Sequence, residues 1–326
     1  MTQPLLSIRG LRVGLRRRKQ TVELIRGVDL DVAPGEKLGI VGESGSGKTL
    51  TMLSVLQLLP GQLRILGGQV VFEGEDLLKA RRERLRQVRG GEVAMVYQDP
   101  MTSLNPLLRI GSQIEETLHA HGVEGGRAAA RTREVLGHVG LPDPERIESS
   151  YPHELSGGML QRVMIAMSLS TSPRVLVADE PTTALDVTIQ QQILDLVESL
   201  QTETGMAVVW VTHDLGVVAR LVDRVAVMYA GRVVEHGSTR DIFARPQHPY
   251  TAALLASLPG PSAEHRLPLR QIGGSPPDPG QLAGGCPFRF RCSSADDHCA
   301  AEEPALLRRG AGQFAACWKE PSTWVQ

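Results

Sequence analysis

The 326-residue sequence lacks features that would mark several classes of protein. No apolar run approaches the ~20 residues that a helix needs to cross a bilayer, and the N-terminus, MTQPLLSIRG, lacks the pattern of a secretory signal. Charge of one sign is not in excess, because 35 Lys and Arg residues oppose 36 Asp and Glu residues. We therefore expect a cytoplasmic chain that binds no nucleic acid and reaches a membrane only through other subunits.

Cysteine is absent from most of the chain and concentrated at one end. All four cysteines lie after residue 285, which sets the C-terminal tail apart from the rest. The passage before them is rich in Pro and Gly from about Pro259 onward, as in a linker. With 326 residues and 41% hydrophobic residues, the chain suits two domains, or one domain with an extension.

Short β-branched runs alternate with helical patterns along much of the chain. Because these runs are apolar on both faces, they predict buried parallel strands in an α/β sheet: Lys37–Val41, Val93–Tyr97, Val175–Ala178, Ala207–Val211 and Val225–Tyr229. Helices are expected over residues 49–59, 187–202 and 215–221. Residues 5–35 read as shorter β pieces that end at a Pro-Gly turn, and residues 100–170 read as helical.

A glycine-rich loop follows the first of the predicted parallel strands. Residues 42–49, GESGSGKT, match the pattern G-x-x-x-x-G-K-[ST] at each fixed position, and a predicted helix follows. Backbone N–H groups of such a loop and the positive end of the helix converge on phosphates. We expect Lys48 to contact the β- and γ-phosphates of ATP and Thr49 to bind Mg²⁺. The expected nucleotide-binding set is Gly42, Glu43, Ser44, Gly45, Ser46, Gly47, Lys48 and Thr49.

Two adjacent acidic residues follow another predicted strand. Asp179 and Glu180 stand at the carboxyl end of the run 175–178, the edge at which open α/β sheets bind ligands. This position predicts that Asp179 holds Mg²⁺ and that Glu180 orients and deprotonates the attacking water. The alternative is that the two acids only cap the next helix.

The run LSGGMLQR at Leu155–Arg162 narrows the class of protein. It precedes VLVADEPTTALD, and together with the phosphate loop it makes the chain resemble the ATPase of an ABC transporter over about residues 5–258. The resemblance implies an α/β P-loop NTPase core within a domain at 1–258. It also implies an N-terminal antiparallel β subdomain, an inserted helical subdomain at about 100–170, and a small cysteine-containing extension at 259–326.

The same resemblance assigns further residues to the site. It implies that Gln98 contacts Mg²⁺ and senses the membrane subunits, that Asp186 couples two sites, and that His213 contacts the γ-phosphate, so that Lys48, Glu180 and His213 are catalytic. Taken alone, His213 reads as an ordinary histidine at a strand end. The signature would close on the ATP of a partner chain, and its residues are Ser156, Gly157 and Gly158. A helix N-terminus there can bind a γ-phosphate across an interface.

The sequence departs from the family pattern at two places. Leu160 stands in the signature where a basic residue is usual. Family members also commonly stack adenine on an aromatic residue before the phosphate loop, whereas no Phe, Tyr or Trp precedes Phe72 here. We therefore expect the adenine to rest on an aliphatic side chain or on an arginine from the stretch Arg16–Arg18.

Three stretches resemble the ATPases of peptide and nickel importers. They are QDPMTSLNP at 98–106, HPYTAALLASLP at 248–259, and the tail that begins GCPFRFRC. The resemblance implies import of di- or oligopeptides or of nickel at the cytoplasmic face of the inner membrane. It also implies four partners: a second, homologous ATPase subunit, two permeases and an extracytoplasmic binding protein. The alternatives are a soluble ABC protein acting on ribosomes or DNA, and an ATPase regulated by an iron–sulfur sensor.

The four cysteines allow more than one kind of site. Cys286, Cys292, Cys299 and Cys317 are separated by five, six and seventeen residues. Disulfides are disfavoured in a cytoplasmic chain, and zinc sites more often show a C-x₂₋₄-C knuckle. The irregular spacing suits a [4Fe–4S] cluster, which the resemblance also implies, while zinc and free thiols remain open.

Overall fold

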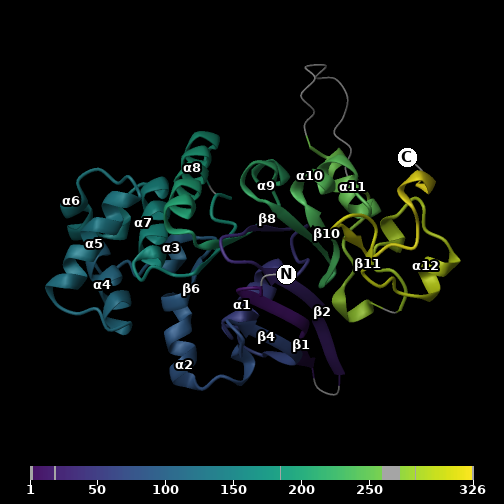
Figure 1. Ribbon diagram of the computed structural model, residues 1–326, viewed down its shortest axis with the longest axis horizontal. Coiled ribbons are helices and arrows are strands. Elements are labelled where there is room, and N and C mark those ends of the chain that lie inside the picture. Colours follow the sequence, from purple (N-terminus) through teal and green to yellow (C-terminus); the bar gives the residue numbers. More distant parts are fainter. Residues whose placement is uncertain (1–2, 18–19, 184, 259–271, 283, 325–326) are drawn as a thin grey trace.

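The computed structural model describes residues 3–17, 20–183, 185–258, 272–282 and 284–324. At its centre is an eight-stranded mixed sheet in the order β11-β12-β10-β9-β3-β8-β7-β6 (Figure 1). Five neighbouring strands are parallel, and all five were predicted: β3 (Lys37–Val41), β6 (Val93–Val96), β7 (Val175–Asp179), β8 (Ala207–Thr212) and β9 (Arg224–Tyr229).

Both faces of the parallel strands are buried, as their uninterrupted apolar sequences predict. In β8, Val208 and Trp210 pack on one face among the helices, and Val209 and Val211 pack on the other against the N-terminal sheet. Alternate residues of a strand point to opposite faces, so an apolar run of this kind is stable only between two covering layers. Trp210 is fully buried.

The covering layer on one side is a four-stranded antiparallel sheet in the order β2-β1-β4-β5. Its strands are β1 (Leu6–Arg17), β2 (Gln20–Val32), β4 (Leu63–Phe72) and β5 (Glu75–Asp76). The first two correspond to the β pieces expected over residues 5–35. The strand β4 was not predicted, because its apolar residues are interrupted by Gly67-Gly68 and four of its ten residues are exposed.

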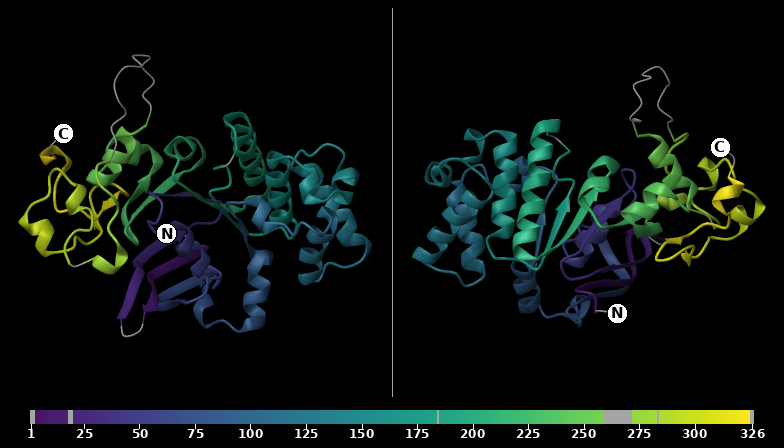
Figure 2. Two further views of the ribbon diagram at one scale, coloured as in Figure 1. Left: turned by 180° about the vertical axis from the view of Figure 1, so that it is seen from behind. Right: turned by 45° about the horizontal axis from the view of Figure 1, so that its top comes forward.

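The inserted helical subdomain lies at the far end of the central sheet from the C-terminus (Figures 1 and 2). It contains α3 (Pro100–Ser103), α4 (Ile110–Ala120), α5 (Gly126–His138), α6 (Pro144–Ser149) and α7 (Gly157–Leu169). This agrees with the helical segment expected at about 100–170. The remaining helices of the main body are α1 (Lys48–Val55), α2 (Arg82–Gln87), α8 (Val187–Thr204) and α9 (Leu215–Leu221).

One helix is shorter than its pattern predicts. The helix α1 ends at Val55 rather than at Leu59, because Gln57 adopts the left-handed conformation with φ of 50°. Its side chain donates a hydrogen bond of 2.6 Å to the carbonyl of Leu77, and this tertiary contact ends the helix before Pro60.

The C-terminal region is joined to the central sheet rather than suspended from it. After β10 (Arg232–Ser238), α10 (Thr239–Ala244) and α11 (Pro249–Ala256), the chain returns through α12 (Asp297–Ala301) to the short strands β11 (Leu307–Arg308) and β12 (Phe314–Ala315). Strand β12 pairs with β10. The boundary expected at residue 258 stays a prediction, and most of the linker-like passage lies outside the described residues.

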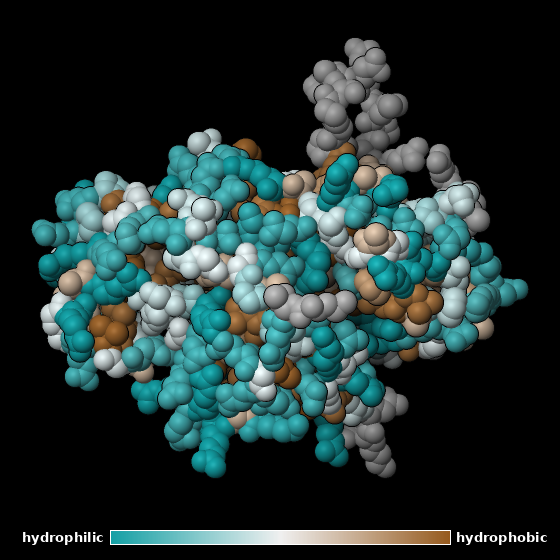
Figure 3. Space-filling model, viewed as in Figure 1, coloured by the Kyte–Doolittle hydropathy of each residue, from teal (hydrophilic) through white to brown (hydrophobic). Residues whose placement is uncertain are grey.

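The described part of the chain contains no helix that combines the length and the apolar character of a membrane-spanning segment. On the face drawn in Figure 3, hydrophilic residues predominate and the apolar patches are small and separate.

Candidate active site

The glycine-rich loop lies between β3 and α1, at the carboxyl edge of the parallel sheet. Gly47, the N-cap of α1, has φ of 105°, which L side chains rarely adopt. A Cβ atom there would lie 2.5 Å from Cδ1 of Ile25. Only glycine fits this close approach, so the turn from the loop into α1 depends on Gly47.

Lys48 is folded back over the loop that precedes it. Its Nζ donates hydrogen bonds to the carbonyls of Gly42 at 2.7 Å and Glu43 at 3.1 Å, and lies 3.9 Å from Oε1 of Glu180. Burial lowers the pKa of Lys48, and the carboxylates of Glu180 and Asp179 oppose that shift. The lysine is therefore a buried cation at the floor of the cleft, suited to a polyanionic ligand.

The first acidic residue meets the phosphate loop directly. The Thr49 hydroxyl donates a hydrogen bond of 2.9 Å to Oδ1 of Asp179 at the end of β7. Burial raises the pKa of Asp179, and the hydrogen bond from Thr49 partly offsets the shift. A hydroxyl and a carboxylate are the ligand types that Mg²⁺ takes at nucleotide sites, so the donor set fits this ion.

Glu180 brings together the other polar residues expected at the site. Its Oε2 accepts hydrogen bonds from Nε2 of Gln98 at 3.3 Å and Oγ1 of Thr183 at 3.0 Å, and lies 3.2 Å from Nδ1 of His213. Glu180 has φ of 47°, and its amide donates to the carbonyl of Val211. A non-glycine residue held in this conformation at the end of a strand aims its side chain away from the sheet and into the cleft.

Most of these residues line one cleft of about 990 Å³; Gly42 and Asp179 are not among its lining residues and reach it only through their hydrogen bonds to Lys48 and Thr49. The hydroxyl of Ser46 is buried and has no hydrogen-bond partner among the described residues, as expected of a group that waits for a ligand. The cleft is lined by the loop residues 43–50, Gln98, Glu180, Thr183 and His213, and also by Leu24, Tyr229, Ala230, Gly231, Pro276, Pro277 and Pro279. The expected arginine is not among them: Arg16 is exposed and does not line the cleft, and the side chains of the next two residues lie outside the described part.

The signature and the coupling aspartate lie elsewhere. Ser156 is the N-cap of α7 and Asp186 the N-cap of α8, and neither lines the cleft. At Gly158 a Cβ atom would lie 2.9 Å from Cγ2 of Ile189 in α8, so the two helix starts pack closely. Leu160, which stands where the family usually has a basic residue, is 1% exposed and packs in the apolar core.

The C-terminal region contributes residues to the site that the sequence did not predict. Both guanidinium nitrogens of Arg291 bind the carboxylate of Glu43 in the phosphate loop, at 2.6 and 2.8 Å, and the amide of Glu43 donates to the Tyr250 hydroxyl at 2.8 Å. No local pattern could have indicated the ion pair, because its partners are 248 positions apart.

The four cysteines converge on one small cavity in the tail, as their grouping predicts. All four are free thiols, and burial raises the pKa of each, that of Cys286 to about 11. Within the described ranges, however, no group of three or more His, Cys, Asp or Glu side chains is arranged to hold a metal ion. The expected [4Fe–4S] cluster is therefore not supported by the present arrangement of the side chains, although the ligand types and their number fit one.

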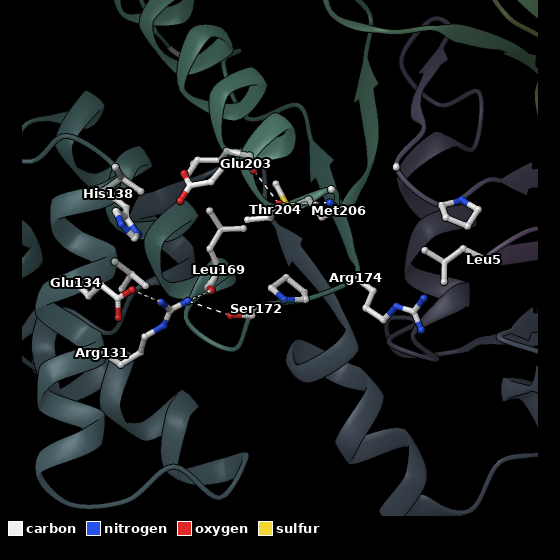
Figure 4. Close-up of a pocket in the computed structure, with 17 residues that line it drawn as sticks. Leu5, Arg131, Glu134, His138, Leu169, Ser172, Arg174, Glu203, Thr204 and Met206 are labelled. Atoms are coloured by element: carbon white, nitrogen blue, oxygen red, sulfur yellow. Dashed lines mark hydrogen bonds and ion pairs between the residues drawn. The ribbon is translucent and has the colours of Figure 1, made fainter.

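A second cavity of about 370 Å³ lies at the opposite, amino-terminal edge of the sheet, between α5 and α8 (Figure 4). Its cationic groups are already engaged. Arg131 donates hydrogen bonds to Glu134, to the Leu169 carbonyl and to Ser172, and Arg174 pairs with Glu73. This cavity offers no counterpart of the phosphate loop.

Comparisons with known proteins agree with the geometry. The chain matches the family model described as ABC transporter over residues 25–183, and the model of the oligopeptide/dipeptide transporter C-terminal region over residues 234–299. A peptide ABC transporter ATP-binding protein of Sinorhizobium fredii is 48% identical over 317 residues, covering 97% of this chain and 95% of that protein. A peptide import ATP-binding protein of Brucella ovis is 46% identical over 332 residues, covering 98% of each.

Among solved structures, the dimeric ATP-binding cassette MJ0796 bound to ADP and Pi superposes with a TM-score of 0.65 at 28% identity. It covers 72% of this chain and 99% of that chain. The phosphate loop, the adjacent acids and the parallel sheet define an ATP-hydrolysing P-loop protein. The chain belongs to the ABC transporter family, as one of its ATPase subunits, which confirms the predicted fold and activity.

Proposed function

We propose that this protein is the energy-coupling ATPase of an importer for di- or oligopeptides, or for a related solute such as nickel. The observation that carries the proposal is the union of a complete phosphate-loop cleft with a C-terminal region of the oligopeptide/dipeptide transporter type. Relatives named as peptide import proteins span nearly the whole chain, which favours peptides as the solute.

The cleft residues suggest how ATP would be bound and cleaved. Lys48 binds the β- and γ-phosphates, and Thr49, Asp179 and Gln98 are the proposed Mg²⁺ ligands, direct or through water. A Mg²⁺ ion held by these residues would neutralise charge on the phosphate oxygens. Glu180, reached by His213 and Gln98, orients the attacking water and accepts its proton. His213 is placed to contact the γ-phosphate.

The signature residues support a partnership between two ATPase chains. Since Ser156 and Asp186 do not line their own chain's cleft, we assign them to the site of a second, homologous subunit. The neighbouring Val187 is 82% exposed at the start of α8, as expected for a side chain that an interface covers. ATP would be held between the phosphate loop of one chain and the α7 N-terminus of the other.

An apolar surface next to Gln98 supports contact with membrane permeases. Met101 and Leu107 are 58% and 82% exposed on the segment that follows Gln98. Such side chains suit the groove that receives a helix of a permease, of which two would be present. This contact would hold the protein peripherally at the cytoplasmic face of the membrane, where an extracytoplasmic binding protein delivers the solute.

We also propose that the four cysteines take up a [4Fe–4S] cluster that staples the small tail. The support is that four thiols, the number of ligands a [4Fe–4S] cluster takes, line one cavity. Zinc and free thiols are the outcomes that would contradict it.

The experiment for the proposed function is reconstitution. The chain is co-expressed with its permeases and second ATPase subunit and placed in liposomes with the binding protein. We expect labelled peptide to accumulate only with ATP, and not when Glu180→Gln replaces the wild type. Recovery of the chain on ribosomes or DNA, without permeases, would overturn the importer.

A further inference from the structure

We propose that the C-terminal extension forms the base-binding wall of the nucleotide cleft, with Pro276, Pro277 and Pro279 holding the adenine and Arg291 fixing their position. The proposal rests on the proposed function, because it takes ATP to be the ligand of this cleft. It names residues more than 200 positions away from the phosphate loop as part of the nucleotide site.

The lining of the cleft divides by chemistry. The phosphate loop with Lys48, together with Glu180 and His213, forms its polar part, whereas Leu24 and the three prolines supply apolar surface. The turn η4 (Pro279–Gln281) packs against β2, which carries Leu24. With the phosphates on the loop, the apolar surface is what remains for a planar, weakly polar base.

Among the residues that the structure describes, no aromatic ring is free to stack on a base in this cleft. None precedes Phe72 in the sequence. Tyr229 borders the cleft, but it is 1% exposed and its ring packs against Tyr250 at 4.6 Å and Phe288 at 5.3 Å. Because Tyr229 is buried among these rings, it offers no open face for stacking, and the base is left with aliphatic surface. Proline rings are rigid, and ordering them around a ligand costs little conformational entropy.

Arg291 joins residues 272–279, which include the three prolines and are called the proline segment below, to the phosphate loop. Its guanidinium group makes the bidentate pair with Glu43, and it also donates hydrogen bonds to the carbonyls of Gly273 at 2.9 Å and Ile272 at 3.4 Å. The side chain is 3% exposed. A buried bidentate pair has a defined geometry, so the start of the proline segment is held at a fixed place beside the loop.

The experiment compares two ligands on the full-length chain. ATP has a base, whereas inorganic tripolyphosphate presents only the phosphates, and the dissociation constants of both are measured with Mg²⁺. We expect the triple change Pro276→Ala, Pro277→Ala and Pro279→Ala to weaken ATP about tenfold, a loss typical of removing a well-packed apolar contact, and to leave tripolyphosphate within about twofold. The single change Pro277→Ala should act in the same direction and serves if the triple variant folds poorly.

Arg291→Met should weaken both ligands, because it frees the proline segment and leaves the Glu43 carboxylate unpaired beside the phosphates. The matched control is Arg289→Met, since Arg289 lies in the same turn and donates to the carbonyls of Gly284 and Cys286 within the tail. It should leave both ligands within about twofold of the wild type.

Three outcomes would overturn the proposal: ATP bound as tightly, or more tightly, by the proline variants; equal losses for the two ligands in those variants; or equal effects of Arg289→Met and Arg291→Met. Failure of the proposed function gives a different pattern. In that case the wild type binds neither ligand, or Lys48→Ala weakens neither.

Discussion

The Thr49 hydroxyl and the Asp179 carboxylate share a hydrogen bond of 2.9 Å, although the two residues are 130 positions apart. This bond joins the phosphate loop directly to the end of β7. Burial keeps the pKa of Asp179 above its ordinary value, so a proton competes with a cation at a higher pH than at an exposed aspartate. The pair therefore predicts that Mg²⁺ binds at Thr49 and Asp179 and competes with a proton for the carboxylate.

Replacing Thr49 by valine removes the hydroxyl at nearly constant volume. We expect the affinity for Mg²⁺ in the presence of ATP to fall by about 10–100-fold, the range found when a partner at a metal site is removed. The measurement is nucleotide binding as a function of Mg²⁺ concentration. Thr49→Ser keeps the hydroxyl and should stay near the wild type; equal losses in the two variants would show that the methyl group, not the hydroxyl, matters.

Glu180→Gln should separate binding from hydrolysis. The amide keeps the shape of the side chain but cannot accept a proton from water, so phosphate release should fall by about 10²–10⁴-fold while ATP is still bound. Phosphate release and equilibrium nucleotide binding are measured on the same sample. Glu203→Gln, in the second cavity, is the matched control. Undiminished hydrolysis in Glu180→Gln would refute its role as the base.

Leu107→Asp tests the surface proposed for the permeases. Leu107 is 82% exposed, so the change should leave the fold and the basal ATPase activity intact. Burying a carboxylate at an interface is unfavourable, and we expect capture of the chain by permease-containing membranes to weaken about tenfold. Leu307→Asp, at a half-exposed leucine of the tail, is the control. Unchanged capture of Leu107→Asp would exclude this surface from the contact.

His248 predicts a pH dependence of stability. The imidazole is completely buried beneath the tail, and burial lowers its pKa to about 3. Because the unfolded chain takes up this proton below about pH 6.5 and the folded chain does not, stability is present above that pH and is lost as the pH falls toward 3. Between pH 7 and pH 5 the loss from this group is about 2 kcal/mol.

The test compares unfolding of the wild type and His248→Asn by urea at both pH values. Asparagine retains an acceptor for the amide of Tyr250, which Nδ1 of His248 now accepts at 3.0 Å, but it does not titrate. Buried Glu235, whose pKa burial raises, acts in the opposite direction in both proteins and cancels in the comparison. If both proteins lose the same stability on acidification, the histidine is not the cause.

Local sequence patterns predicted those parts of the protein that are formed by consecutive residues. The parallel strands, the phosphate loop and Asp179-Glu180 follow from apolar runs and from loop geometry, and the sheet does bring the loop and the acids together. The pairing of β12 with β10 and the ion pair of Arg291 with Glu43 were not predictable in this way. Both depend on the path that the chain takes back to the sheet, which no local period encodes.

The four cysteines provide the last prediction. Their grouping in the sequence indicates a metal centre, whereas their side chains are not arranged as metal ligands. They share one cavity, yet the described residues form no ready metal site. A cluster that binds as the tail folds would draw the four thiols inward and take them up as thiolates, against the raised pKa values of Cys286 and Cys317. Protein prepared without oxygen should then contain about four irons and absorb near 400 nm, and Cys317→Ser should lose most of both signals. Four titratable thiols without iron, or one bound zinc, would show that the tail does not hold the cluster.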